Sequence, residues 1–500
     1  MGPSTRSAHG SPTWRSAFVT TDIICSLIVM AASAPRANRY LRSEPGDGES
    51  RRRRSPGLTS LGRSPVLWVT AAAFGPYVIQ SLGVRLEHIA IYGFGIWGLA
   101  SILTAGKNAK PPGLVVASVF AGCAVLATVV TVLGPLRLRD PVQALSDLDH
   151  YLRPIALSLG VAGWAIHRRV FSVREALRQV CIVIIALLGA NTLLSLAGSA
   201  TDIRAVIEPF RSGRGGDPLQ NSNIGLFLDF SKEGRVTGIF AFPFEAGVAY
   251  SVGLFAWAYV ARTRLGPITM RMYGVLALLA VGGLLSVSKV FIFGGIPLFV
   301  LYWIWGGHLI RLISPRFVLV VSAALVALNL SLSDWVGLER FANRFATVTD
   351  GSKDFIEVIT ANRFGVEGST VGSETLHLLE SGDALFGVGV GTPILLDNAY
   401  LVFLAQGGII SLMAYLAVLA WLATLSWRLR RYAPNEAQLV FVLTIFVVGA
   451  GLGAPVVSTI RASTILWLVL LLAMATLVKA REAQEGQLPT LRASRWSRSP

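Results

Sequence analysis

The chain has 500 residues, of which 53% are hydrophobic and only 14% are charged. A soluble protein of this length needs about a quarter of its residues charged to cover its surface, so the composition excludes one and indicates a polytopic membrane protein. The formal net charge of +16 does not call for nucleic acid, because basic residues concentrate in the cytoplasmic loops of membrane proteins.

The apolar stretches predict an all-α integral membrane protein with twelve transmembrane helices, since about 20 apolar residues cross the hydrocarbon core. The stretches are 66–83, 86–105, 112–135, 151–166, 174–197, 237–260, 272–287, 289–306, 317–334, 399–427, 437–457 and 462–479. Residues 1–65 are predicted to form a disordered, basic N-terminal region. Within it, residues 16–34 are apolar but contain Asp22, which leaves a thirteenth span open.

Basic residues predict the orientation of the membrane domain, residues 66–480. Arginine and lysine gather in alternate loops, for example at Arg51 to Arg54, and in the tail 481–500, which places these segments and both chain ends in the cytoplasm. Two long loops, 198–236 and 335–397, then lie on the extracytoplasmic face. Long loops in compact proteins are usually functional or disordered, so we expect the function outside the cytoplasm.

The motifs of nucleotide and metal enzymes do not occur in the sequence. There is no P-loop, no Rossmann glycine motif and no His-Glu-x-x-His motif, and the cysteines Cys25, Cys123 and Cys181 lie in apolar runs. No cofactor or metal is therefore predicted, and the energy must come from the substrate or an ion gradient. We find no duplicated halves with matching broken helices, which are typical of secondary transporters.

Charged residues at the outer helix ends are the first functional candidates, because charge in a membrane is costly. Arg235 precedes Gly238 and Pro243, which break the start of an apolar helix; its guanidinium could bind phosphate or extend to the interface. Glu245 is expected to bond a neighbouring helix. Four more positions on this face, Ser288-Lys289, Arg85, Arg153 and Arg461, complete the set. Together they resemble a receptor for pyrophosphate, although Arg85 could instead pair with Glu87.

Two residues are candidates for acid–base chemistry. Asp397 ends the second long loop and directly precedes a helix, where it could cap the helix or act as a general base. His377 lies inside the same loop and is the alternative base.

The ordered motifs resemble the O-antigen ligase and polymerase superfamily. Arg235-Val-Thr-Gly-Ile-Phe-Ala-Phe-Pro243 is similar to that family's Arg-x-x-Gly-x-Phe-x-x-Pro-Asn motif, with Phe244 in place of the Asn. The run from Leu385 to Gly391, with Asp397-Asn-Ala-Tyr-Leu401 and Gly407-Gly-Ile-Ile410, resembles its second motif, and Ser286-Val-Ser-Lys289 its Ser-Arg motif.

The resemblance implies a metal-independent glycosyltransferase with a GT-C-like fold. Such enzymes move a glycan from a polyprenyl-pyrophosphate carrier to a hydroxyl acceptor on the outer face of the bacterial plasma membrane. By this resemblance Arg235 and Arg363 bind the pyrophosphate, Lys289 replaces the family arginine, and Ser288, Asn398 and Tyr400 belong to the substrate site.

Asp397 stands where ligases of the family carry His, which favours a polymerase of lipid-linked repeat units. Two alternatives stay open: a ligase that transfers the finished glycan to a lipid or protein, and a transporter of polysaccharide or lipid-linked sugar without chemistry. The expected partners are the lipid-linked oligosaccharide, membrane lipid and other proteins of envelope-glycan assembly.

Overall fold

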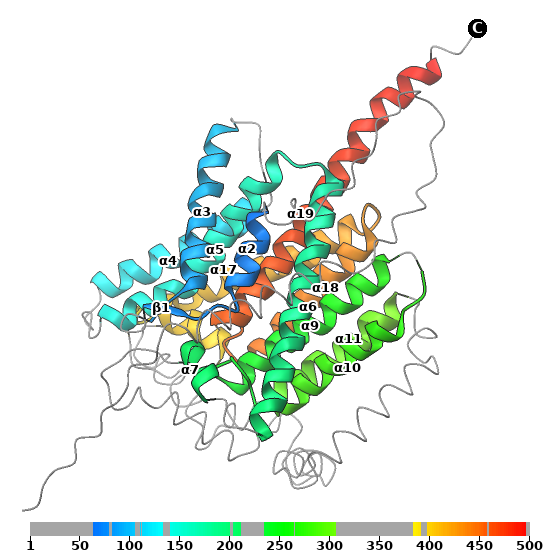
Figure 1. Ribbon diagram of the computed structural model, residues 1–500. Coiled ribbons are helices and arrows are strands. Elements are labelled where there is room, and N and C mark those ends of the chain that lie inside the picture. The colour runs from blue at the N-terminus through cyan, green and yellow to red at the C-terminus, as the bar shows by residue number, and fades with distance from the viewer. Residues whose placement is uncertain are drawn as a thin grey trace, which may run out of the picture.

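The protein is an assembly of long helices, seen here in a computed structural model (Figure 1). The structure describes residues 64–79, 83–105, 111, 113–133, 141–200, 204–211, 235–264, 266–306, 384–391, 398–457 and 460–496. All structural statements below concern these residues. The described elements are almost entirely helical, with one short antiparallel pair of strands, β1 (Tyr77–Ile79) and β2 (Val84–Arg85).

One group of helices is built around α5 (Pro141–Ile166), which packs against α3 (Leu86–Thr104) and α4 (Gly113–Leu133). Helix α17 (Ala399–Leu429) packs on α4. Small residues allow the closest approach, since a Cβ on Gly98 of α3 would lie 2.3 Å from the Leu159 carbonyl oxygen of α5. Such stripes of small residues let helix backbones touch in membrane proteins.

A second group surrounds α9 (Pro243–Thr263), which is buried along most of its length. Its neighbours are α6 (Val170–Ala200), α10 (Met270–Leu285), the π-helix η3 (Val290–Gly295) with α11 (Ile296–Trp305), and α18 (Pro434–Gly451). Helix α19 (Ile460–Trp496) runs between the two groups and contacts α5, α6, α9 and α18 (Figure 1). The short helices α2 (Pro65–Ala72) and α7 (Arg204–Arg211) complete the described part.

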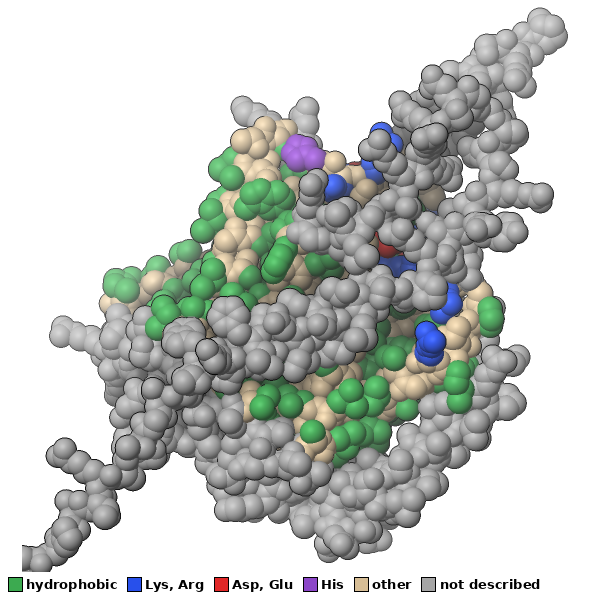
Figure 2. Space-filling view, in the orientation of Figure 1, with side chains coloured by type: hydrophobic (Ala, Val, Ile, Leu, Met, Phe, Trp, Pro, Cys, Tyr) green, Lys and Arg blue, Asp and Glu red, His purple; other side chains and the backbone are tan. Residues whose placement is uncertain are grey.

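Seven of the described helices are long and apolar enough to cross a membrane: α3, α4, α6, α9, α17, α18 and α19. The protein is therefore an all-α, polytopic membrane protein. Figure 2 shows hydrophobic side chains over much of the described surface, and exposed residues such as Ile96, Leu103 and Leu133 belong to the spanning helices. Helix α10 and the pair η3–α11 are shorter apolar helices, and the predicted span 317–334 lies outside the described residues, as do residues 1–63.

Several predicted helices differ from the structure at their ends. The span 66–83 is not one helix, because α2 ends at Ala72 and the chain passes Gly75-Pro76 into β1; Gly83, at φ +66°, then turns it into β2. The span 237–260 starts six residues late at Pro243, since proline is favoured in the first turn of a helix and residues 235–242 are irregular. Helix α19 also continues past the predicted 479 to Trp496.

Candidate functional site

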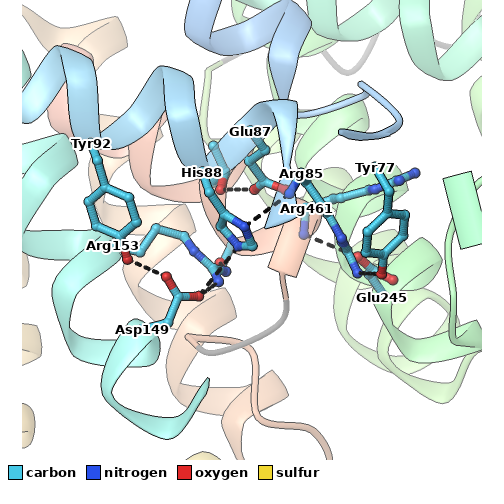
Figure 3. A network of polar contacts seen from close by, with 11 residues as sticks. Tyr77, Arg85, Glu87, His88, Tyr92, Asp149, Arg153, Glu245 and Arg461 are labelled. Atoms are coloured by element: carbon cyan, nitrogen blue, oxygen red, sulfur yellow. Dashed lines mark hydrogen bonds and ion pairs between the residues drawn. The ribbon is translucent and has the colours of Figure 1, made fainter. Parts of the chain in front are cut away.

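Polar and charged side chains gather where α3, α9 and α19 begin, beside α5 (Figure 3). The cluster holds three arginines and three carboxylates. Its charged members are Arg85, Arg153, Arg461, Glu87, Asp149 and Glu245. We call these six residues, with Tyr77, His88 and Tyr92, the outer cluster, after the outer helix ends at which the sequence predicts its arginines. All three arginines are site residues predicted from the sequence, and the fold brings them together around Glu87, which lies within electrostatic range of each.

Arg461 forms hydrogen bonds to four other segments of the chain. It is 2% exposed, and its guanidinium donates to the carbonyl oxygens of Ile239 (2.8 Å), Phe210 (2.8 Å) and Gly75 (3.1 Å). Its backbone N–H donates to Glu245 Oε1 at 3.1 Å, while Glu245 Oε2 accepts from the Ala241 N–H at 3.0 Å. Glu245 thus links α9 to α19, as the sequence predicted for a carboxylate that needs a neighbouring helix.

Arg153 forms the central ion pair of the cluster. Its guanidinium donates to Asp149 Oδ2, one turn earlier on α5, and to Ser463 Oγ of α19 at 3.2 Å. Arg153 is 1% exposed, and it lies within α5 rather than at a helix end, because α5 begins ten residues before the predicted position 151. Asp149 also accepts from the Tyr92 hydroxyl, and His88 Nε2 lies 3.7 Å from its Oδ2.

Arg85 differs from the other two arginines in its partner. It faces Tyr77 across the strand pair, donates to the Tyr77 hydroxyl and lies 4.5 Å over the ring. The alternative role of Arg85, a local ion pair with Glu87, is not found; Glu87 accepts instead from the Thr464 hydroxyl of α19. Arg85 is 4% exposed, and its Nε donor has no hydrogen-bond partner among the described residues. The Tyr77 phenol is neutral, so the positive charge of Arg85 has no hydrogen-bonded carboxylate and can attract another anion.

Two titratable groups lie on α5 outside the seven apolar spans. Burial opposes ionisation of Asp149, but Arg153, His88 and the Tyr92 hydroxyl outweigh it and lower the pKa of the carboxyl. Burial, together with the charge of Arg153, lowers the pKa of His150 to about 4. Asp149 is therefore an anion and His150 a neutral ring at neutral pH.

The two halves of the second motif fold onto each other. Helix α17 contains a kink at Gly407 and Gly408, and Gly408 has φ +65°. At this kink the Val388 N–H donates to the Ala405 carbonyl at 2.6 Å, and the Ile409 N–H to the Ala384 carbonyl at 2.8 Å. A Cβ on Gly408 would lie 2.1 Å from the Leu385 carbonyl oxygen. The glycines of this motif are thus required by close backbone packing.

One stretch of α5 connects this motif to the outer cluster. Asp147 Oδ2 accepts from the Gly391 N–H at 2.9 Å, and Asp149 and Arg153 follow within two turns. His150 and Tyr151 line a small cavity against Ala399 and Phe403 of α17. Helix α5 therefore contacts the second motif through Asp147 and contributes Asp149 and Arg153 to the outer cluster.

The first motif lies on the other side of the outer cluster. Its irregular segment 235–242 is held by Asn191 of α6, whose Oδ1 accepts from the Ile239 N–H at 2.8 Å, and by the Val236 N–H, which donates to the Leu285 carbonyl at 2.9 Å. That bond brings Arg235, which is half-buried, near the segment that contains Ser288 and Lys289. Val287, between α10 and η3, has a strained φ of +46°.

Three of the residues predicted from the motifs have structural contacts. Ser288 is buried against Gly247 of α9. Asn398 accepts from the Tyr400 N–H and caps α17, while its amide donates to the Leu452 carbonyl at 2.9 Å. The Tyr400 hydroxyl donates to the Val448 carbonyl at 2.6 Å. These bonds hold the start of α17 against the end of α18.

Three predicted site residues, Arg363, His377 and Asp397, lie outside the described residues, as does most of both long loops. Sequence reasoning missed Asp149, Tyr92 and Tyr77 as members of the cluster. Spacing could have indicated Asp149, which stands four residues before Arg153; nothing local indicates that Tyr92 reaches across to α5. Within the described ranges, no three His, Cys, Asp or Glu side chains are grouped so that they could hold a metal ion.

Comparison with models of known protein families finds no match to the chain. Comparison with curated protein sequences likewise finds no match.

Proposed function

We propose that this protein is a GT-C-like glycosyltransferase that polymerises polyprenyl-pyrophosphate-linked repeat units on the extracytoplasmic face of the bacterial plasma membrane. In this proposal the hydroxyl of one lipid-linked unit attacks the anomeric carbon of another, and the polyprenyl pyrophosphate leaves. In this proposal the predicted span 317–334 also crosses the membrane, in addition to the seven apolar helices described above.

The observation that carries the proposal is the position of residues 147–153 of α5. Through Asp147 this stretch accepts from the Gly391 N–H of the second motif, and through Arg153 it donates to Ser463 of α19, two residues after Arg461. The first motif binds Arg461 through the Ile239 carbonyl. Motifs separated by more than a hundred residues thus border one polar cluster, as a transferase needs for a donor and an acceptor site.

The charge of the cluster suits a pyrophosphate leaving group. The Arg85 guanidinium donates to one neutral phenol, whereas Arg153 is paired with Asp149 and the guanidinium of Arg461 already donates to three backbone carbonyls. A buried guanidinium stabilises negative charge that develops on a leaving group, a contribution of about 3–4 kcal/mol per donor. Arg85 is therefore the arginine that we assign to the leaving phosphate, with Arg235 and Lys289 as further candidates from the first and Ser-Arg motifs.

Gene deletion with complementation tests the proposal. Surface glycans and lipid-linked intermediates would be sized by gel electrophoresis and mass spectrometry in the deleted strain. Loss of long chains, with single lipid-linked units remaining, supports the polymerase. Long chains that accumulate on the polyprenyl carrier indicate the ligase instead.

Point variants separate an enzyme from a transporter. Arg85→Ala and Asp397→Ala should restore no long chains, while Arg178→Ala, an exposed arginine of α6, should restore them fully. Unchanged glycans in the deletion strain, or full rescue by both Arg85→Ala and Asp397→Ala, would contradict the transferase and favour a transporter.

A further inference from the structure

The outer cluster contains three carboxylates, and they differ in whether they can reach a substrate. Both oxygens of Glu245 accept backbone N–H groups, so this carboxylate is fully used in holding α9 and α19. Glu87 is 1% exposed and accepts from Thr464. The side chain of Asp149 is 19% exposed. A base that takes a proton from an acceptor hydroxyl must approach it within hydrogen-bond distance, and among these three only Asp149 can do so.

The contacts of Asp149 orient its carboxylate. Tyr92 donates to Oδ1 and Arg153 to Oδ2, which fixes the plane of the carboxylate against α3 and α5 (Figure 3). A carboxylate oxygen can accept more than one hydrogen bond, so both oxygens keep lone pairs for an acceptor. Arg153 is itself held by Ser463 of α19, and the pair cannot move without disturbing three helices.

His88 separates Asp149 from Arg85. Its Nδ1 accepts from the Arg85 backbone N–H at 3.2 Å, so the neutral ring carries its proton on Nε2, which faces Asp149 Oδ2 at 3.7 Å. With no free lone pair, His88 cannot take the proton itself. Figure 3 shows His88 between the carboxylate and the arginine. A sugar bound next to His88 would have Arg85 on one side and the Asp149 carboxylate on the other.

We propose that Asp149 is the general base of the transfer reaction, an inference that rests on the proposed function. The acceptor hydroxyl oxygen forms a bond to the anomeric carbon while the bond from that carbon to the pyrophosphate oxygen breaks. The leaving pyrophosphate takes the electron pair of the broken bond next to Arg85, and the hydroxyl proton passes to Asp149. Because the side chain is partly exposed, the proton then leaves to solvent and the carboxylate is ready for the next unit.

A purely structural role for Asp149, neutralising Arg153, makes a different prediction. Loss of the carboxylate would then disturb Arg153 and the whole cluster, and both binding and reaction would fail together. A base predicts that only the reaction fails. Binding of a lipid pyrophosphate should persist, since Arg85 is untouched and Arg153 loses a competing anion.

The test uses the purified full-length protein in lipid nanodiscs. The variants are Asp149→Asn, Asp149→Ala and Asp149→Glu, with Glu175→Gln as a matched control, because Glu175 pairs with Arg178 at i,i+3 on α6. Chain growth is followed on lipid-linked glycans extracted from the deleted strain, and binding is measured with geranylgeranyl pyrophosphate as the probe. Size-exclusion profiles exclude misfolded variants.

We expect Asp149→Asn to lower the rate of chain growth about 100-fold or more, with probe affinity within about threefold of wild type, because neither Arg85 nor its tyrosine partner is altered. Added formate should restore part of the rate of Asp149→Ala, and Glu175→Gln should match wild type. If Asp149→Asn misfolds, the inference is tested by the chain growth that Asp149→Glu retains and by formate rescue of Asp149→Ala.

Three outcomes overturn the inference: wild-type chain growth in Asp149→Asn, joint loss of growth and probe binding in a folded Asp149→Asn, or no formate rescue of a folded Asp149→Ala. Failure of the proposed function looks different. In that case the wild-type protein neither extends the glycans nor binds the probe.

Discussion

Replacement of Arg461 tests whether this arginine is a structural clamp or a ligand for substrate. Its guanidinium donates to carbonyl oxygens of three segments that are distant in sequence, namely Gly75, Phe210 and Ile239. In Arg461→Ala these carbonyls lose a charged donor in a site without solvent access, whereas the backbone bond from residue 461 to Glu245 can persist. The strand pair, α7 and the first motif would then lose their common attachment to α19.

The size of the effect follows from burial. Hydrogen bonds from charged donors contribute about 1.5–3 kcal/mol each, and removal of one partner from a buried charged network costs about 3–5 kcal/mol. An unfolding entropy of about 2.1 cal/mol/K per residue gives about 1 °C per kcal/mol for a chain of this length, so Arg461→Ala should lower the melting temperature by about 3–5 °C. The melting temperature of Arg461→Lys should lie between those of wild type and Arg461→Ala, because an ammonium group can donate to some of the three carbonyls but not to all of them.

The assay is thermal unfolding in detergent, followed by fluorescence-detected size exclusion after heating. Arg178→Ala serves as the control, since exposed ion pairs contribute about 0–1 kcal/mol and its melting temperature should match wild type. If Arg461→Ala melts like wild type but binds geranylgeranyl pyrophosphate more weakly, the clamp interpretation is refuted and Arg461 is a substrate ligand.

Three further predictions concern packing and pH. Gly98→Ala should destabilise the protein, because the added Cβ would lie 2.3 Å from the Leu159 carbonyl oxygen. The control Gly93→Ala on the same helix meets open space and should be neutral or stabilising by up to about 1 kcal/mol. Equal melting temperatures of the two variants would contradict the α3–α5 contact. Gly408→Ala should lower the melting temperature and abolish chain growth, because residue 408 has φ +65° and lies against Leu385; normal growth would show that the kink in α17 is dispensable. Arg153, His88 and Tyr92 lower the pKa of the Asp149 carboxyl, so its contribution to stability is present above the ordinary carboxyl pKa and is lost as the pH falls through the lowered value. Asp149→Asn should therefore flatten the acid side of a plot of melting temperature against pH. An unchanged slope would argue against the Asp149–Arg153 ion pair.

The sequence predicted much of the helical framework because long apolar runs have few alternatives in a membrane. The predictions 86–105, 174–197 and 399–427 agree closely with α3, α6 and α17. The sequence prediction failed where local backbone geometry determines the path of the chain. The apolar run 66–83 contains Gly75-Pro76 and Gly83, and the chain there turns into a strand pair that places Arg85 opposite Tyr77.

The candidate site was predicted in its charges but not in its pairings. Membrane charge is costly, which singled out Arg85, Arg153 and Arg461 without knowledge of the fold. Which of them is left without a carboxylate or a set of backbone acceptors depends on its partners in the fold, such as Asp149 for Arg153 and the carbonyl of Phe210 for Arg461. The spacing of four residues could have indicated Asp149, but the carbonyl partners of Arg461 are brought to it by tertiary packing, which no local pattern reveals.

Reconstitution of the reaction is the most direct test of the central claim. Purified wild-type protein would be mixed with lipid-linked glycans extracted from the deleted strain, and the products would be analysed by mass spectrometry. The polymerase account predicts glycans longer by whole repeat units, with one polyprenyl pyrophosphate released for each new linkage and no added nucleotide or metal. Lipid-linked glycans of unchanged length, with no polyprenyl pyrophosphate released by a folded protein, would contradict it.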